Sequence, residues 1–274
     1  MADNFKLAKK MLKIMKSGSY FLEDREISLK NFIDESVKNI EMGTIESLIT
    51  KETTKIGDNE NKVCVQSVRE KGFMLNVPFM YNNNTSGTKD AYTPKTIVLT
   101  MTKKKFKDNL DLLEDNEIGA ILRTTTFGMI YKEIKESWQK VVEEKTDLTK
   151  ILFVPDVKII LSPSGKPITP ISFNVLIIAV PTEKEYRKLN DDIDIETINS
   201  RIIADIFESS IRLGCKAIVV NPSQLKVFRN NKGITSKFFK AALTSDRIND
   251  NFKVVHLTNC YFKNKDDINS LFLI

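Results

Sequence analysis

The pattern of apolar and polar positions is clearest in the second half of the chain, where a long amphipathic helix leads into a buried strand. From Asp194 onward, apolar residues recur at spacings of three and four, which places them on one face of a helix. Gly214 follows that helix, where a left-handed C-terminal cap is expected. The apolar run Ala217–Val220 then predicts a short strand covered on both faces. The loop after such a strand, residues 221–229, is expected at the ligand-binding edge of the sheet.

The rest of the chain yields further helices and strands by the same criteria. Predicted helices span residues 4–16, 28–42, 106–113, 117–142, 236–243 and 266–273. Predicted strands span residues 63–68, 73–80, 96–101, 151–161, 171–180 and 253–257. Three consecutive threonines, at residues 124–126, weaken the middle of the helix predicted for 117–142. The alternation of strand and helix in the second half predicts an α/β sheet with helices on both faces.

Composition places the chain among ordinary globular proteins. Its 274 residues are 41% hydrophobic and 28% charged. No apolar run reaches the roughly 20 residues that a membrane span requires. The N-terminus has no uninterrupted apolar segment followed by small residues, which argues against a secretory signal. We therefore expect an intracellular protein, cytoplasmic or nuclear, without a membrane as partner.

Cysteine and histidine usage limits the chemistry that the chain can support. The three cysteines, Cys64, Cys215 and Cys260, are far apart and odd in number, which fits a reducing compartment and argues against a disulfide framework or a zinc site. The single histidine, His256, makes histidine-based metal or triad chemistry improbable. We expect no metal and no cofactor.

The charge of +6 is a mild basic excess, with 42 basic against 36 acidic residues. The densest basic run is Lys103, Lys104, Lys105 and Lys107 around Phe106. A solvated start of a helix accounts for this run better than a groove that follows phosphates. Nucleic acid is therefore an unfavoured partner that the sequence does not exclude.

Six segments together resemble the microbial-type poly(ADP-ribose) glycohydrolases, whose core is a macro domain. These segments are AKKMLKIMKSGSYF (8–21), ITKETT (49–54), MLNVPFMYNNNTSG (74–87), EIGAILRTTTF (117–127), ILFVPDV (151–157) and NPSQLKVFRNN (221–231). The resemblance implies a three-layer macro-domain-like sandwich, with a mixed sheet and helices on both faces. The helical pattern of the first 45 residues predicts an N-terminal helical extension, residues 1–45, packed on a macro-domain-like core of residues 46–274.

In that family, two glycine-rich loops and a glutamate perform the chemistry. Backbone N–H groups of the loops hold the diphosphate of ADP-ribose, because only glycine lets the chain approach so closely. A glutamate at the reacting centre protonates the leaving group during hydrolysis of the ribosyl bond.

The first of these loops is altered in this chain. In an alignment without gaps, Asn82 falls on the loop asparagine of the family. Asn84, Thr85 and Ser86 then fall where three glycines belong, and Gly87 is the only glycine nearby. These side chains could still donate hydrogen bonds to a phosphate, or the run could be a surface loop that binds nothing.

The helix that carries the family's glutamates is altered as well. Glu117 falls on a glutamine of the family motif, while Ile118 and Gly119 fall on its two glutamates. A shift of one or two residues would bring Glu117 into the catalytic position but would lose the matches at Ala120 and Arg123. Glu117 is therefore a weak catalytic candidate, and a first-turn glutamate favoured by the helix dipole is the simpler interpretation.

In the last loop, Gln224, Leu225 and Lys226 replace a glycine-rich element, although Val227 and Phe228 persist. Lys226 could neutralise a phosphate as a point charge, or it could fill a vacated pocket. Phe228 could stack on a base, although core packing is the more common role of such a residue.

The candidate ligand-binding residues, vestigial in this interpretation, are Asn76, Asn82, Asn84, Thr85, Ser86, Gly87, Lys226 and Phe228. Asn76 is included because a polar residue inside an apolar strand must find a partner, either a ligand or a backbone group. For His256 and Cys215, a structural histidine and a buried packing thiol are the favoured interpretations.

Three functions follow, in decreasing order of support. The first is a degenerate, non-catalytic macro-domain-like protein that acts as a structural or protein-interaction module, with another protein as partner. The second is a binding module that retains ADP-ribose or a related nucleotide. The third is an active ADP-ribosyl glycohydrolase with relocated catalytic residues.

Overall fold

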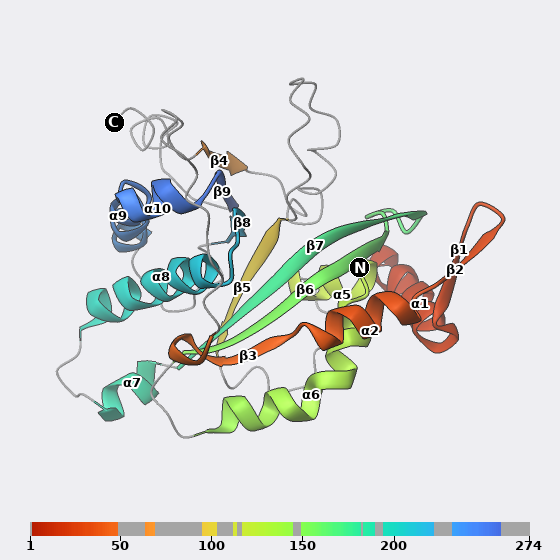
Figure 1. The fold of residues 1–274 in the computed structure, drawn as a ribbon, viewed down its shortest axis with the longest axis horizontal. Coiled ribbons are helices and arrows are strands. Elements are labelled where there is room, and N and C mark those ends of the chain that lie inside the picture. Colours follow the sequence, from red (N-terminus) through yellow and green to blue (C-terminus); the bar gives the residue numbers. More distant parts are fainter. Residues whose placement is uncertain are drawn as a thin grey trace.

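A seven-stranded mixed sheet forms the centre of the molecule (Figure 1). The structure is a computed structural model that describes residues 2–48, 64–68, 95–102, 112–113, 117–144, 149–181, 183–189, 194–221 and 232–258. The strands are β3 (Glu41–Thr44), β4 (Cys64–Val68), β5 (Thr96–Thr102), β6 (Lys150–Leu161), β7 (Pro167–Val180), β8 (Ala217–Val220) and β9 (Val254–Thr258). Their order is β3-β6-β7-β5-β8-β9-β4. Strands β7, β5, β8, β9 and β4 run parallel, whereas β6 is antiparallel to both of its neighbours.

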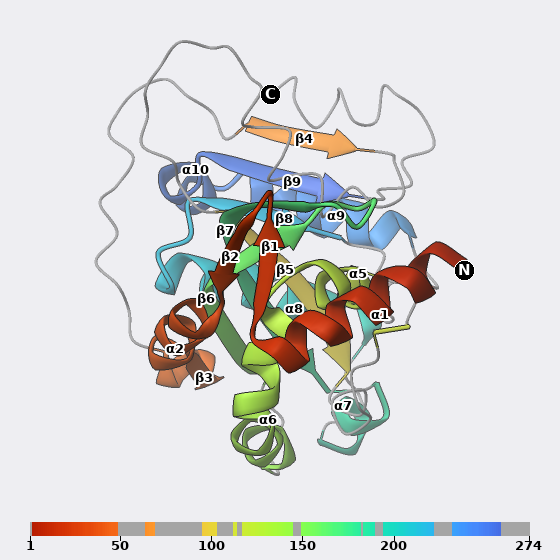
Figure 2. The same cartoon turned by 90° about the vertical axis from the view of Figure 1, so that its right-hand side faces the viewer.

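Helices cover both faces of this sheet, which confirms the predicted three-layer arrangement (Figures 1 and 2). One face packs against α2 (Lys30–Lys38), α5 (Glu117–Thr124) and α6 (Phe127–Glu143). The other face packs against α7 (Glu183–Leu189), α8 (Ile195–Arg212), α9 (Lys232–Leu243) and α10 (Asp246–Asn251). Each face of the sheet has its own apolar core, because alternate residues of a strand point to opposite faces. In β5, Ile97 and Leu99 belong to the first core and Val98 to the second.

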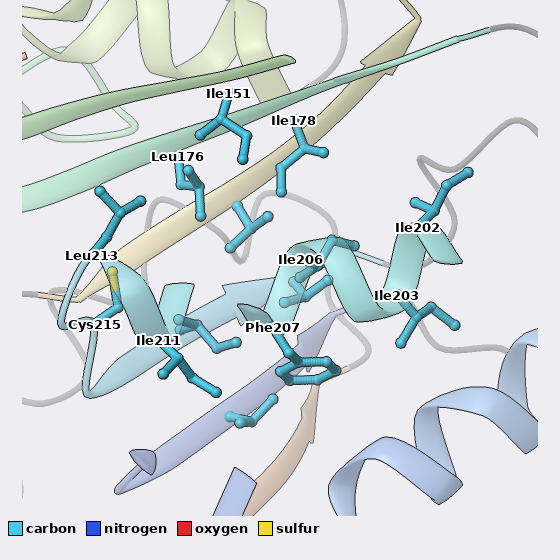
Figure 3. Packing of buried hydrophobic residues seen from close by; sticks show 14 of the residues in the cluster. Ile151, Leu176, Ile178, Ile202, Ile203, Ile206, Phe207, Ile211, Leu213 and Cys215 are labelled. Carbon is cyan, nitrogen blue, oxygen red and sulfur yellow. The ribbon is translucent and has the colours of Figure 1, made fainter. Parts of the chain in front are cut away.

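The amphipathic helix predicted after Asp194 is α8, and its apolar stripe faces the sheet (Figure 3). Ile202 and Ile206 are fully buried in the same cluster as Leu176 and Ile178 of β7. Burial of each such side chain stabilises the fold by about 1.5–3 kcal/mol. At the start of the helix, the Thr197 amide donates to the Asp194 carboxylate at 2.5 Å.

The predicted ends of this unit are also confirmed. Gly214 has a φ of +71°, the left-handed conformation expected after the last turn of α8. Cys215 is buried, as predicted for a packing thiol, and β8 follows with all four residues buried.

The single helix predicted for residues 117–142 is wrong, because the structure contains two helices there. Helix α5 ends at Thr124 and α6 begins at Phe127. Between them, Thr126 and Lys158 of β6 exchange two hydrogen bonds, from the Thr126 amide to the Lys158 carbonyl and from the Lys158 amide to the Thr126 hydroxyl. The threonines that weaken the helical pattern therefore join the backbone to the sheet instead.

A β-bulge in β6 explains the Pro-Asp-Val sequence inside a strand. The register against β7 shifts between Val154 and Val157, so Pro155 and Asp156 lie outside the regular ladder. Proline is tolerated at such a position because its missing N–H is not needed for strand pairing. Asp156 adopts a positive φ of +56°, and its amide donates to the Asn174 side chain at 3.1 Å.

The N-terminal region contains more β-structure than the sequence pattern predicts. After α1 (Ala2–Ser17), β1 (Ser19–Leu22) and β2 (Arg25–Ser28) form a hairpin. Tyr20 points toward the core, where its hydroxyl donates to the Ile168 carbonyl at 2.8 Å and burial raises its pKa to about 12. The helix predicted for 28–42 is shorter: α2 ends at Lys38, and β3 then pairs with β6.

Several predicted elements fall wholly or mostly outside the described residues, namely the strand at 73–80 and the helices at 106–113 and 266–273. The prediction that residues 1–45 form an extension packed on the core stays a prediction. Helix α1 packs through Met11 and Ile14 against Ile160 and Leu161 at the end of β6.

Candidate functional site

The topology places a candidate site between the carboxyl ends of β5 and β8, which are neighbours in the sheet. The chain leaving β5 continues to α5 on one face, whereas the chain leaving β8 continues to α9 on the opposite face. In open α/β sheets, ligands bind in the crevice where successive connections diverge in this way. This crevice is the position that the sequence pattern assigned to the loop after β8.

Two buried polar residues lie at or near these strand ends. Thr100 lies near the end of β5, and Asn221 is the first residue after β8. The register pairs Val98 with Val220, so Asn221 follows at the level of Leu99. A hydroxyl and a carboxamide can donate and accept hydrogen bonds without carrying charge. In the described residues of the two strand ends, 99–102 and 218–221, there is no acidic or basic side chain.

The start of α5 contributes the third side of the site. The helix begins at Glu117, whose side chain lies outside the described part. Ile118 is only 3% exposed and belongs to the same apolar cluster as Leu99 and Met101 of β5. Gly119 is buried beside it. The two positions that align with the glutamates of the family thus hold a core side chain and a glycine.

Arg123, which the alignment matches to a family arginine, has a structural contact in this fold. Its guanidinium is buried, and Nη1 donates to the Leu112 carbonyl at 2.6 Å. Leu112 packs against the clusters on the α5 side of the sheet. This hydrogen bond joins Leu112, which lies between β5 and α5 in the sequence, to the last turn of the helix.

The ligand-binding residues predicted from the sequence lie outside the described part of the chain. This applies to Asn76, Asn82, Asn84, Thr85, Ser86, Gly87, Lys226 and Phe228. It also applies to the lysine run at residues 103–107 and to the side chain of His256, whose backbone lies in β9 as predicted. Asn221 opens the loop that the sequence pattern placed at the ligand-binding edge, residues 221–229, but it was not named as a site residue. Thr100 was not singled out, and its only signal is its place near the end of an apolar strand.

Perturbed ionisable groups occur elsewhere in the fold. Burial raises the pKa of Asp205 on α8, although its carboxylate accepts a 2.5 Å hydrogen bond from the Thr149 hydroxyl. Thr149 precedes β6, which lies two strands from β5 in the sheet. Burial lowers the pKa of Lys95, at the opposite end of β5, to about 7. Within the described residues, no group of histidine, cysteine and carboxylate side chains could hold a metal ion. Among those same residues, no helix is both long enough and apolar enough to cross a membrane.

Comparisons with solved structures identify the architecture. The poly(ADP-ribose) glycohydrolase from Thermomonospora curvata matches with a TM-score of 0.68 over 99% of this chain and 98% of that chain, at 11% identity. This chain has the fold of a microbial-type poly(ADP-ribose) glycohydrolase. The same T. curvata enzyme bound to the inhibitor ADP-HPD matches with a TM-score of 0.66 and 12% identity, over 99% of this chain and 98% of that chain.

A second glycohydrolase gives the same result at lower similarity. The enzyme from Deinococcus radiodurans in complex with ADP-ribose matches with a TM-score of 0.59 over 88% of this chain and 98% of that chain, at 10% identity. No protein-family model matches the sequence. No curated protein matches it either. The resemblance drawn from the six segments is confirmed for the fold, and at these identities it extends no further.

Proposed function

We propose that the chain is a degenerate, non-catalytic macro-domain-like protein that acts as a structural or protein-interaction module. The observation that carries this proposal is the burial of Ile118, which is 3% exposed at the start of α5. In the gapless alignment this position belongs to a glutamate at the reacting centre. An apolar side chain that packs with Leu99 and Met101 can neither protonate a leaving group nor orient a water molecule.

Two substituted loops support the same proposal. Asn84, Thr85 and Ser86 replace one set of glycines, and the element at residues 224–226 contains none. A Cβ atom at such positions occupies space through which backbone N–H groups would otherwise reach a diphosphate. Among the described residues, the carboxyl ends of β5 and β8 carry buried uncharged polar side chains, Thr100 and Asn221, and no charged one.

Calorimetric titration with ADP-ribose tests the proposal. We expect no binding tighter than about 100 μM, which corresponds to roughly 5.5 kcal/mol. Circular dichroism and a cooperative thermal transition of the same sample establish that it is folded. Stoichiometric binding with a dissociation constant below about 100 μM would refute the proposal that the chain no longer binds ADP-ribose.

Such binding would support the second candidate, a module that holds ADP-ribose or a related nucleotide without cleaving it. The observation in its favour is the shared fold, since glycohydrolases of this fold have been crystallised with ADP-ribose and with ADP-HPD. In this case Lys226 would supply a point charge for a phosphate. Lys226→Gly should then weaken the titrated affinity, whereas under the first proposal the variant should still show no binding.

The third candidate, an ADP-ribosyl glycohydrolase with relocated residues, depends on Glu117. It predicts release of ADP-ribose from a modified protein by the wild-type chain and loss of that release in Glu117→Ala. Glu133→Ala, at an exposed position of α6, is the matched control and should leave any release unchanged. Absence of release from the wild-type chain supports the first proposal.

We further propose that residues 1–45 are an extension packed on a core formed by residues 46–274, to whose sheet the extension contributes the edge strand β3. The contacts of Met11, Ile14 and Leu29 with Ile160 and Leu161 support this arrangement. Limited proteolysis near residue 50, followed by gel filtration, should leave the two pieces associated.

A further inference from the structure

The most exposed large apolar side chains of the described residues gather at one end of the molecule. Phe5 is 49% exposed, Leu12 44%, Phe21 60% and Leu113 52%. Phe5 and Leu12 belong to α1, and Phe21 to the hairpin strand that follows it. Leu113 follows Leu112, which packs against the apolar cluster of α1. Such a concentration of exposed apolar side chains is typical of an interaction surface.

Helix α1 presents a separate outer face that the fold itself does not use. Its inner face, including Ala8, Met11 and Ile14, is buried. The outer face carries Phe5 and Leu12 together with four exposed lysines, Lys6, Lys9, Lys13 and Lys16. At 3.6 residues per turn these six residues share one side of the helix. The Lys9 ammonium lies 4.4 Å from the centroid of the Phe5 ring, so charge and apolar surface adjoin each other.

The neighbouring hairpin carries the opposite charge. Glu23, Asp24 and Glu26 are exposed around its turn together with one basic residue, Arg25, so the turn is net acidic. Phe21 stands opposite Glu26 in the ladder and points away from the core, because the alternate residue Tyr20 points inward. Figure 2 shows α1 and the hairpin together at the front of the molecule. One end of the chain therefore combines a basic helix face, an acidic turn and exposed apolar side chains.

We propose that this end, α1 together with the β1–β2 hairpin, is the interface of a weak two-fold homodimer. In a two-fold interface the same surface meets itself, so the basic helix face of each copy can lie against the acidic turn of the other. The exposed apolar side chains, Phe5, Leu12 and Phe21, then lie near the centre of the contact. This inference goes beyond the proposed function and does not depend on whether the crevice binds a ligand.

A second copy fits the surface better than a nucleic acid does. A polyanion would use the lysines of α1, but it would place phosphates beside Glu23, Asp24 and Glu26. It would also leave Leu12 and Leu113 without an apolar partner. A second copy offers a partner for the basic face of α1, for the acidic turn and for the exposed apolar side chains.

The size of the surface predicts weak association. A 16-residue helix is about 24 Å long and about 10 Å wide, and the hairpin adds four residues per strand. Such a contact lies at or below the lower end of stable protein–protein interfaces. We therefore expect a dimer that forms only at high concentration.

Sedimentation velocity of the full chain from about 2 μM to about 200 μM tests the proposal. The weight-average mass should rise from 31.3 kDa toward twice that value. Leu12→Glu combined with Phe21→Glu should keep the chain monomeric throughout. Both positions are exposed, and an unchanged thermal transition would show that the variant is folded.

Charge reversal provides a sharper test of the arrangement. Lys9→Glu with Lys13→Glu, or Glu23→Lys with Asp24→Lys, should each lower the association constant at least tenfold by placing like charges together. The variant with all four changes should dimerise again, because the complementarity is restored with opposite signs. Lys184→Glu with Lys188→Glu on α7 is the matched control and should dimerise like the wild type.

Three outcomes would overturn the proposal. They are a monomer at every concentration, a dimer that the α1 and hairpin variants leave unchanged, and failure of the four-fold variant to recover. Binding of a single-stranded oligonucleotide that is lost in Lys9→Glu with Lys13→Glu, by a chain that stays monomeric, would assign the surface to a polyanion instead. The ADP-ribose titration reports on the crevice alone, so it separates failure of this proposal from failure of the proposed function.

Discussion

The two ends of β5 and β8 differ in how their polar groups are used. At the amino end, Thr96 donates from its hydroxyl to the Cys215 sulfur at 3.2 Å, and the Asn174 side chain donates to the Thr96 hydroxyl at 3.3 Å. Lysines precede three adjacent strands there, at Lys95, Lys216 and Lys253. At the carboxyl end, the described residues supply Thr100 and Asn221, apolar neighbours and no charge.

This distribution is the reverse of what a ligand held by charged side chains at the carboxyl ends would require. In a doubly wound sheet the carboxyl ends receive the ligand, and the amino ends serve the fold. Here the lysines lie at the amino ends, where burial, and then the charge of Lys253, lowers the pKa of Lys216. The carboxyl ends instead extend the apolar core up to Ile118. The described strand ends therefore carry no charged side chain, in a fold that the chain shares with the glycohydrolases.

The largest effect is expected from placing a carboxylate at the carboxyl end. Ile118→Glu introduces the residue type that the gapless alignment assigns to this position. If the position is part of the core, the buried charge should lower the free energy of unfolding by roughly 3–5 kcal/mol. Urea denaturation measures the change. Ile118→Leu, which keeps the apolar volume, is the control and should cost less than about 1.5 kcal/mol.

If Ile118→Glu is well tolerated, the carboxyl ends do not extend the apolar core, and the contrast between the two ends of the sheet is wrong. That result would show that the position faces a solvated crevice, as a reacting centre must. Release of ADP-ribose by that variant would show in addition that the wild-type chain lacks only this carboxylate for the hydrolysis.

A smaller effect is expected at the amino end, from Lys95→Met. Lys95 is 9% exposed, and burial lowers its pKa from 10.5 to about 7. Below pH 7 the ammonium is protonated in both the folded and the unfolded chain, so the folded chain carries the cost of burying it. Between pH 7 and 10.5 the folded chain has released the proton while the unfolded chain still binds it, so the stability of the wild type rises with pH.

The methionine variant should therefore be more stable than the wild type at pH 6. We expect the free energies of unfolding to differ by about 2 kcal/mol at pH 6, because solvent screening reduces the cost of burying the ammonium. The difference should disappear near pH 10. Chemical denaturation at both pH values measures it. Lys253→Met removes an exposed lysine from the same end of the sheet and should change stability by less than about 0.5 kcal/mol. If the stability of the wild type falls from pH 7 to pH 10 relative to the variant, the pKa of Lys95 is not lowered by burial.

The sequence predicted those parts of the fold whose pattern is local. Helix α8 and strand β8 follow from the spacing of isoleucines, from Asp194 and from Gly214, because periodicity and capping act within a few residues. It did not predict the break at Thr125, because the hydrogen bonds that open the helix come from β6, about 30 residues later. The hairpin and β3 were missed for a similar reason, since four-residue strands carry too little alternation to be recognised.

The sequence placed the candidate site at the loop after the strand that became β8, and this placement stays a prediction. The structure adds that the carboxyl end of β5 adjoins that of β8. The motif residues were identified by alignment alone, and apart from Ile118, Gly119, Ala120 and Arg123 of α5 the aligned site residues lie outside the described residues. Burial of Ile118 could not be read from its own sequence, because an isoleucine in the first turn of a helix faces the core or the solvent depending on what packs beside it.

The smallest effect is expected from Asn174, which links β7 to both of its neighbours at the amino end. Its side chain accepts from the Asp156 amide at 3.1 Å in the β6 bulge and donates to the Thr96 hydroxyl at 3.3 Å on β5. Asn174→Ala removes both contacts and leaves the Asp156 amide without this acceptor, which should lower the free energy of unfolding by about 1–2 kcal/mol.

A double-mutant cycle separates the two contacts of Asn174. Thr96→Val removes the hydroxyl and keeps the shape of the side chain. If the three residues form one network, the cost of Asn174→Ala should be smaller in the Thr96→Val background, with a coupling of roughly 0.5 kcal/mol or more. Additive costs would show that Asn174 supports only the bulge. The amino end would then be two independent contacts and not the connected framework that distinguishes it from the carboxyl end.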